Sequence, residues 1–118
     1  MAVKIKRVYE PAANTDGYRI LIDRLWPRGL SKERAQVDKW LKEVAPSTEL
    51  RKWFNHEPEK WEAFRKKYHA ELTGSTAFAE LQQDIHNHKT ITLLFGARDE
   101  QHNDAVALEQ FLKEQGAR

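Results

Sequence analysis

A short run of branched apolar residues that gives way abruptly to charge constrains the fold of this chain more than any other feature. The run ends at Ile22, and Asp23 and Arg24 follow it directly. A continuously apolar strand is typical of a parallel sheet that is covered on both faces. The sequence therefore predicts a buried strand over residues 18–23 with polar groups at its carboxyl end, where α/β sheets build their ligand sites.

Three other segments have strand character. Residues 3–8 alternate apolar residues with lysine, which predicts a half-exposed strand at or near the sheet edge. Residues 90–95 are apolar and β-branched and end at Gly96, which predicts a second central strand. Residues 36–45 fit a helix slightly better than a strand by pattern alone. The pairing of the first two strands, as a hairpin or through a short crossover, stays open.

Apolar stripes with helical spacing predict four helices in the rest of the chain. The stripes are Leu50, Trp53 and Phe54; Trp61, Phe64, Tyr68 and Leu72; Phe78, Leu81 and Ile85; and Ala105, Leu108, Phe111 and Leu112. Start and stop signals flank these helices at Ser47, Pro58, Gly74, Ser75 or Thr76, Asn103 and Gly116. Three tryptophans, Trp40, Trp53 and Trp61, are expected in or near the core.

Strands mixed with helices along one chain predict an α/β fold. We expect a small, mostly parallel sheet of about four strands, flanked by helices in a three-layer-like arrangement. The 118 residues contain no linker rich in Pro, Gly or Ser, so we expect a single domain over residues 1–118. A chain of this length buries roughly two thirds of its unfolded surface in one core.

Composition excludes several kinds of chemistry. The sequence has no cysteine, which excludes disulfides, thiolate catalysis and cysteine-ligated metals. We expect no cofactor and no metal: His86–His88 suits a helix end, and Asp99, His102 and Asp104 form a one-loop grouping that is common by chance. No apolar stretch resembles a signal peptide or a membrane span, so the expected location is the cytoplasm.

The charge is small overall but unevenly distributed. The net charge is +2, yet residues 1–34 carry eight Lys and Arg against four Asp and Glu, whereas residues 78–118 carry four against seven. A local basic region favours a small anionic ligand as the partner. One alternative is a nucleic-acid-binding module that uses the basic first third of the chain, and another is a non-catalytic protein-interaction domain. The oligomeric state stays open.

Four separated motifs carry a resemblance to a known family. They are DRLWPRG at Asp23–Gly29, APS at Ala45–Ser47, LRKWF at Leu50–Phe54 and LLFGARDEQHN at Leu93–Asn103. From about residue 3 to residue 114, the chain resembles the YeaO-like bacterial proteins of the family called domain of unknown function 488. This family has no established activity.

The resemblance implies a small cytoplasmic α/β domain in which Asp23, Arg24, Pro27 and Arg28 follow a central strand. It also implies a strand over residues 37–45, which replaces the helical interpretation of that segment. Other branches of the family carry a Cys-His-Arg-like triplet in the last strand-to-helix loop. The matching stretch here lies near His102 and Asn103 and has no cysteine, so a thiol mechanism is not implied for this chain.

If the strands ending at Asp23, Ala45 and Phe95 are parallel neighbours, the polar groups behind them converge. Guanidinium groups and helix N-termini bind oxyanions, so this edge predicts a site for a phosphate, a carboxylate or a nucleotide. The expected ligand-binding residues are Arg24, Trp26, Arg28, Ser47, Arg98 and Asn103. The expected role of Trp26 is stacking on a ligand ring or a guanidinium.

A hydrolase-like enzyme is one form that such a site can take. The candidate catalytic residues are then Asp23, Asp99 and His102, with Asp99 orienting His102 as a general acid or base. In the alternative interpretation, Asp23 and the neighbouring arginines pair with one another to brace loops, and Trp26 packs as a lid on the core. The role of His56 stays undecided.

Overall fold

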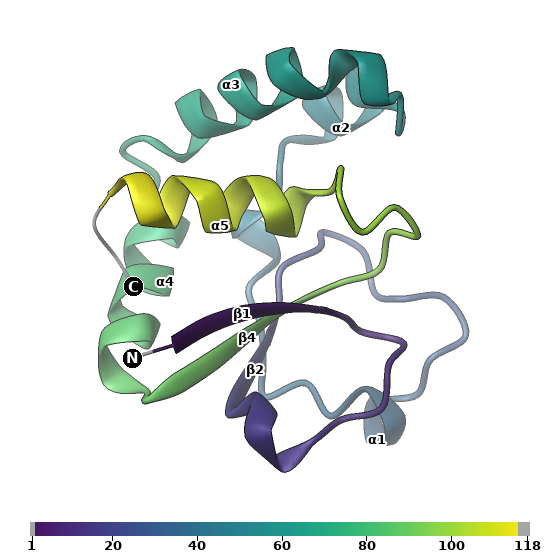
Figure 1. Ribbon diagram of the computed structural model, residues 1–118, viewed down its shortest axis with the longest axis vertical. Helices are drawn as coiled ribbons and strands as arrows, with labels where there is room; N and C mark the ends of the chain where they lie inside the picture. Colours follow the sequence, from purple (N-terminus) through teal and green to yellow (C-terminus); the bar gives the residue numbers. More distant parts are fainter. Residues whose placement is uncertain (1, 116–118) are drawn as a thin grey trace.

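The computed structural model describes residues 2–115 and contains a four-stranded sheet with the order β1-β4-β2-β3. All neighbouring strands are parallel, which confirms the predicted α/β fold (Figure 1). The strands are β1 (Ala2–Arg7), β2 (Tyr18–Leu21), β3 (Lys39–Trp40) and β4 (Thr90–Phe95).

Residues 2–115 also form five α-helices and three single-turn 3-10 helices, of which all but α5 lie between strands in the sequence. The α-helices are α1 (Lys32–Ala35), α2 (Thr48–Phe54), α3 (Trp61–Leu72), α4 (Thr76–Asn87) and α5 (Asp104–Glu114). The 3-10 helices are η1 (Asn14–Asp16), η2 (Lys42–Val44) and η3 (Pro58–Lys60). None of the helices between residues 2 and 115 has the length and apolar character that a membrane crossing requires.

Local signals account for most helix boundaries. The side-chain oxygens of Ser47, Ser75 and Asn103 accept hydrogen bonds from the first turns of α2, α4 and α5, as the sequence predicted. Pro58 begins η3, which leads directly into α3. Gly116, expected beyond the last helix, lies outside the described residues.

The two faces of the sheet are covered unequally. The main core forms between one face and helices α2 to α5, and Ile20 and Ile22 point into it. Leu21 and Leu94 point to the opposite face, where they pack with Ala35 of the four-residue α1 and with loops. The central strands are therefore buried on both faces, as predicted, but the second covering layer is thin.

The connection between β1 and β2 is a crossover, because β4 lies between these strands. Gly17 ends this connection with a φ of +68°. A Cβ atom at this position would lie 2.3 Å from the backbone oxygen of Thr90. Only glycine lets the chain enter β2 this close to β4.

Two expectations need correction. The strand expected over residues 37–45 is only two residues long, because the chain turns into η2 after Trp40 and Leu41. Trp40 and Trp53 are 37% and 39% exposed and are not core residues. The amino groups of Lys60 and Lys67 lie 5.0 and 5.3 Å from the Trp53 ring centre, which stabilises that ring at the surface.

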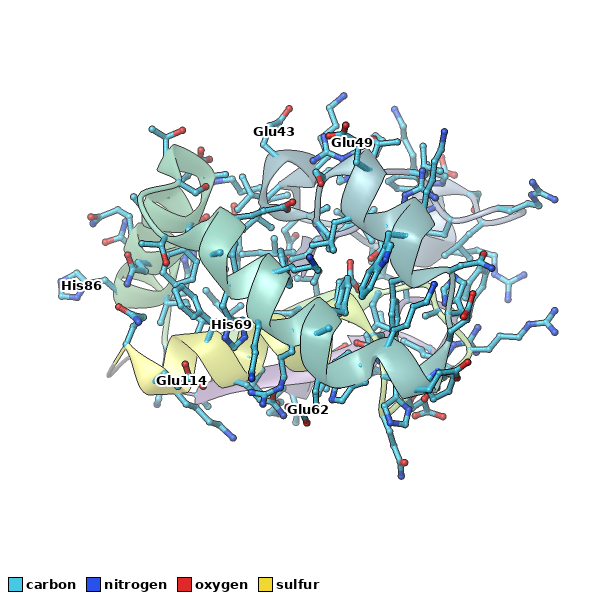
Figure 2. The ribbon with its side chains drawn as sticks, turned by 90° about the horizontal axis from the view of Figure 1, so that it is seen from above. Glu43, Glu49, Glu62, His69, His86 and Glu114 are labelled. Carbon is cyan, nitrogen blue, oxygen red and sulfur yellow. The ribbon has the colours of Figure 1, made fainter. Side chains whose placement is uncertain are left out.

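Polar contacts join α3 to α5 above the sheet. His69 of α3 and Glu114 of α5 lie close together in Figure 2, and His69 Nδ1 is 3.7 Å from a Glu114 carboxyl oxygen. The other ring nitrogen of His69 is 3.0 Å from the backbone oxygen of Ala107. These contacts hold α3 in place, and α3 supplies one wall of the pocket described next.

Candidate functional site

A pocket of about 440 Å³ lies at the carboxyl ends of β2 and β4. Figure 1 shows the course of the chain there, where β4 leads into α5. Its volume lies within the roughly 300–1,000 Å³ that is usual for small-molecule sites. The residues that line it are Asp23, Arg24, Leu25, Arg28, Ala45, Pro46, Arg51, Phe54, His56, Phe64, Gly96, Ala97, His102, Asn103 and Asp104.

Two carboxyl groups face each other in this pocket. Asp23 follows β2, and its Oδ2 accepts a hydrogen bond of 2.8 Å from the Gly96 N–H, which ties the ends of β2 and β4 together. Asp104 begins α5, and its carboxyl is hydrogen-bonded to that of Asp23. Burial, and then the charge of Asp23, raise the pKa of Asp104 well above its ordinary value. Asp104 therefore holds its proton to a higher pH than an ordinary carboxyl does.

Arg24 also lines the pocket, and the fold occupies only some of its hydrogen-bond donors. Its Nη2 donates to the backbone oxygens of Ala45 and Pro46 at 3.3 and 3.5 Å. Its Nε is buried and has no partner among residues 2–115. Arg24 therefore both braces the loop before α2 and keeps one donor free.

Tyr68 of α3 also contacts the segment that leads into α2. The Tyr68 hydroxyl donates a hydrogen bond of 2.6 Å to the backbone oxygen of Val44. Burial, together with nearby carboxylates, raises the pKa of Tyr68 well above its usual value, so this hydroxyl stays a donor. The pocket wall at Ala45 and Pro46 is thus fixed by side chains from two different elements.

The rim of the pocket is positively charged. Arg28 and Arg51 are exposed there, as is His56. No ion pair in the described part of the chain involves Arg24, Arg28 or Arg51. Their guanidinium charges therefore remain available to a ligand.

Part of the pocket lining is apolar. Phe54 of α2 and Phe64 of α3 are buried, and their stacked rings are 4.3 Å apart. Leu25 stands at the edge and is 63% exposed. The pocket lining therefore combines cationic groups, an apolar wall and the carboxyl pair.

Five of the nine predicted catalytic and ligand-binding residues line this pocket. They are Asp23, Arg24, Arg28, His102 and Asn103. Asn103 is almost fully used by the fold, because its Oδ1 caps α5 and its Nδ2 donates to the backbone oxygen of Asp99 at 2.9 Å. His102 packs edge-on against Trp61, at 5.4 Å between ring centres.

Asp99 does not line the pocket but holds the His102 ring. Its Oδ2 is 3.0 Å from His102 Nδ1, the contact expected from the sequence. Backbone N–H groups of Gln101 and His102 donate to its Oδ1. These hydrogen bonds lower the pKa of Asp99 below its ordinary value, so the carboxylate stays ionised beside the ring.

The other three predicted ligand-binding residues do not line the pocket. Trp26 turns to the opposite face of the sheet, where it packs in the small core and its Nε1 donates to the backbone oxygen of Leu30 at 2.7 Å. Ser47 caps α2 and donates its hydroxyl to Glu71 at 2.7 Å. Arg98 is exposed on the loop after β4. Position after a strand does not determine which way a side chain points.

Sequence reasoning missed several pocket residues. Arg51, Phe54 and Phe64 were assigned to helices, and their approach to the end of β2 depends on how the helices fold back on the sheet. Asp104 was considered only as a helix-start residue and in the one-loop grouping with Asp99 and His102, and acids are common at helix starts for electrostatic reasons. A sequence signal that could have pointed to Asp104 is the combination of two acids, one at the first residue of a helix and one directly after a buried strand. No cluster of three or more potential ligands within residues 2–115 is arranged to hold a metal ion.

Comparison with known proteins identifies the family. A family model described as the inactive DUF488-N3 subclade matches residues 2–118. The uncharacterized protein YeaO of Escherichia coli is 44% identical over 113 residues, which cover 96% of this chain and 98% of that protein. The uncharacterized proteins Mb3100c of Mycobacterium bovis and Rv3073c of Mycobacterium tuberculosis are each 40% identical over 110 residues, covering 93% of this chain and 92% of theirs.

No solved structure matches the chain. The matches to the family model and to the three relatives each cover more than nine tenths of the chain. The chain therefore belongs to the inactive DUF488-N3 subclade, among the YeaO-like members of the domain of unknown function 488 family.

Proposed function

We propose that the pocket binds a small organic anion, with Arg24 as the central contact and Arg28 and Arg51 at the rim. The observation that carries this proposal is the buried Nε of Arg24, which has no partner within the described residues. An unsatisfied buried donor costs about 1–3 kcal/mol, and a ligand oxygen would recover that free energy. A charged donor of this kind selects carboxylate or phosphate.

The apolar wall supports an organic body on the anion. Leu25, Phe54 and Phe64 contribute apolar surface next to the arginines. An inorganic ion would leave this surface in contact with water, whereas an organic group would cover it at about 25 cal/mol per Å² of buried apolar area. The favoured ligand therefore joins an oxyanion to an apolar or aromatic group.

Binding is favoured over catalysis. The matching subclade is described as inactive, and the sequence has no cysteine to act as a nucleophile. One observation favours a hydrolase-like alternative, because a proton-holding Asp104 beside Asp23 resembles the paired acids of general acid–base catalysis. Release of phosphate from a phosphomonoester by the native chain, lost in Asp104→Asn, would favour that alternative.

The nucleic-acid alternative has less support, because basic side chains of the first third are engaged within the fold. Lys4 and Lys6 donate to the backbone of Thr15 and to the Asp16 carboxylate. Arg7 donates to the backbone oxygen of Ala97 at 2.8 Å. A protein-interaction role has only scattered exposed apolar groups to support it. These are Tyr9, Leu25, Trp40 and Trp53.

Calorimetric titration with phenyl phosphate at low ionic strength tests the proposed function. We expect saturable binding by the native chain and at least about tenfold weaker binding by Arg24→Met, since the loss of a charged hydrogen bond removes about 1.5–3 kcal/mol. Arg98→Met is the matched control, because Arg98 is exposed and does not line the pocket. Equally weakened binding in both variants would show that the loss of one positive charge, and not the loss of a specific contact, lowers the affinity. No binding by the native chain would refute the proposal.

A further inference from the structure

The carboxyl pair offers the pocket hydrogen-bond acceptors, which an anionic group on a ligand cannot satisfy. Asp23 and Asp104 both line the pocket, and together they present several oxygen acceptors. An oxyanion placed against them would be repelled. The anionic part of a ligand therefore belongs with the arginines, and the part that meets the acids must donate hydrogen bonds.

The acids have acceptor capacity left for a ligand. Asp23 uses its Oδ2 for the Gly96 N–H, at 2.8 Å. Asp104 uses its Oδ1 for the Ala105 N–H, at 3.0 Å. The remaining oxygens serve the hydrogen bond between the two acids and keep further lone pairs free, because each carboxyl oxygen accepts about two hydrogen bonds. An amino group on a ligand fits this arrangement.

The apolar part of the lining favours a flat ring as the bearer of that amino group. Phe54 and Phe64 form a stacked pair beside the pocket, and Pro46 adds a third rigid apolar surface. Aromatic and proline surfaces match the face of a planar heterocycle better than a flexible chain. A pocket of about 440 Å³ holds a ligand of mononucleotide size.

We infer that the occupant is a nucleoside monophosphate whose base carries an exocyclic amino group, with the base held by Asp23 and Asp104 and the phosphate by the arginines. This inference rests on the proposed anion-binding function and adds the chemical class of the ligand. When the base binds, the proton of Asp104 turns from Asp23 to a ring nitrogen, and the freed carboxyl oxygens accept from the amino group. Cytosine and adenine present these two groups side by side, whereas uracil and hypoxanthine lack the amino group.

Calorimetry with matched nucleotides tests the inference. The probes are CMP against UMP and AMP against IMP, with ribose 5-phosphate and phosphoethanolamine as ligands that lack a base. We expect CMP and AMP to bind at least about tenfold more tightly than UMP and IMP, because a site built for a hydrogen bond rejects an analogue that leaves it unpaired. The ligands without a base should bind more weakly still.

Variants of Asp104 test whether the acids cause the preference for CMP over UMP. In Asp104→Ala the preference for CMP over UMP should fall below about twofold. Asp104→Leu, of similar size, serves if the alanine variant does not fold, and it should also narrow the preference because leucine offers the base neither a donor nor an acceptor. Glu100→Gln is the control, because Glu100 is exposed in the preceding loop and does not line the pocket.

The outcomes separate the two proposals. Equal affinity for CMP, UMP and ribose 5-phosphate, all weakened in Arg24→Met, would overturn base recognition and leave anion binding in place. Affinity for phosphoethanolamine equal to that for CMP would also overturn it, because an amine without a ring would then suffice. Failure of every probe, phenyl phosphate included, would overturn both proposals.

Discussion

Two arginines at opposite ends of β2 differ in how completely the fold uses them. Arg19, near the start of the strand, is 4% exposed, and its three nitrogens donate to the backbone oxygens of Gln36 and Ala35 and to the Asp16 carboxylate. Arg24, just after the strand, makes two long contacts through one nitrogen and keeps a buried Nε without a partner within residues 2–115. Full pairing indicates a structural role, and incomplete pairing indicates capacity for a ligand.

The acids at the two ends differ in the same way. Burial alone would raise the pKa of Asp16, but hydrogen bonds from the Ala13 N–H, Lys6 and Arg19 lower it below the ordinary value. At the other end burial and Asp23 raise the pKa of Asp104. The amino end of the sheet is thus a satisfied ion cluster, whereas the carboxyl end keeps an acid that holds its proton.

Single replacements of the two arginines should give the largest difference in the free energy of unfolding between the two ends of β2. Arg19→Met should lower the free energy of unfolding by about 3–5 kcal/mol, because it leaves Asp16 buried with only Lys6 as a charged partner. Arg24→Met should cost about 1 kcal/mol or less, because it removes only two weak contacts. Urea denaturation of both variants checks the difference. Equal losses would show that Arg24 is as structural as Arg19.

Two glycines provide a second, smaller contrast. Gly17 and Gly29 both have positive φ, at +68° and +76°, but an added Cβ at Gly29 meets nothing within 4 Å. Gly29→Ala should therefore cost about 1 kcal/mol for backbone strain alone. Gly17→Ala should cost at least about 2 kcal/mol, because its Cβ also collides with Thr90. Thermal unfolding of the two variants would contradict this account if their melting temperatures agreed.

The two ends should respond to pH with opposite signs. The raised pKa of Asp104 means that the folded state holds a proton that the unfolded state releases above about pH 3.8, so this group destabilises the fold as pH rises through that window. The lowered pKa of Asp16 means that its contribution is present above about pH 3.8 and is lost as pH falls through the folded value.

Denaturation from pH 3 to pH 7 measures both effects. Relative to Asp104→Asn, the native chain should lose stability with rising pH, at no more than about 1.4 kcal/mol per pH unit for one proton. Relative to Asp16→Asn, it should lose stability with falling pH. A native chain that tracks Asp104→Asn at every pH would show that Asp104 titrates normally.

Local patterns in the sequence predicted most of the fold. The apolar runs at β2 and β4 and the caps at Ser47 and Asn103 were recognisable because each depends on neighbouring residues. The length of β3 was wrong, because its two residues pair with β2 and have no pattern of their own. Strand order was open for the same reason, since pairing is set by contacts far apart in the chain.

The candidate site was predictable only in part. Asp23 and Arg24 were found because they follow a buried strand directly. Trp26, two residues further on, belongs to the opposite face, and its direction depends on a loop conformation that no periodicity encodes. Arg51 and Asp104 approach the pocket only after α2 and α5 fold onto the sheet, so no local pattern links them to β2.

The central claim is that Arg24 keeps an open donor for a ligand, whereas Arg19 does not. The most direct measurement is a nuclear magnetic resonance titration that follows the Nε–Hε signals of both arginines as CMP is added. We predict a saturable shift of the Arg24 signal with the Arg19 signal unchanged, and its loss when ribose is added in place of CMP. An Arg24 signal that stays fixed, or shifts only in parallel with Arg19, would contradict the account.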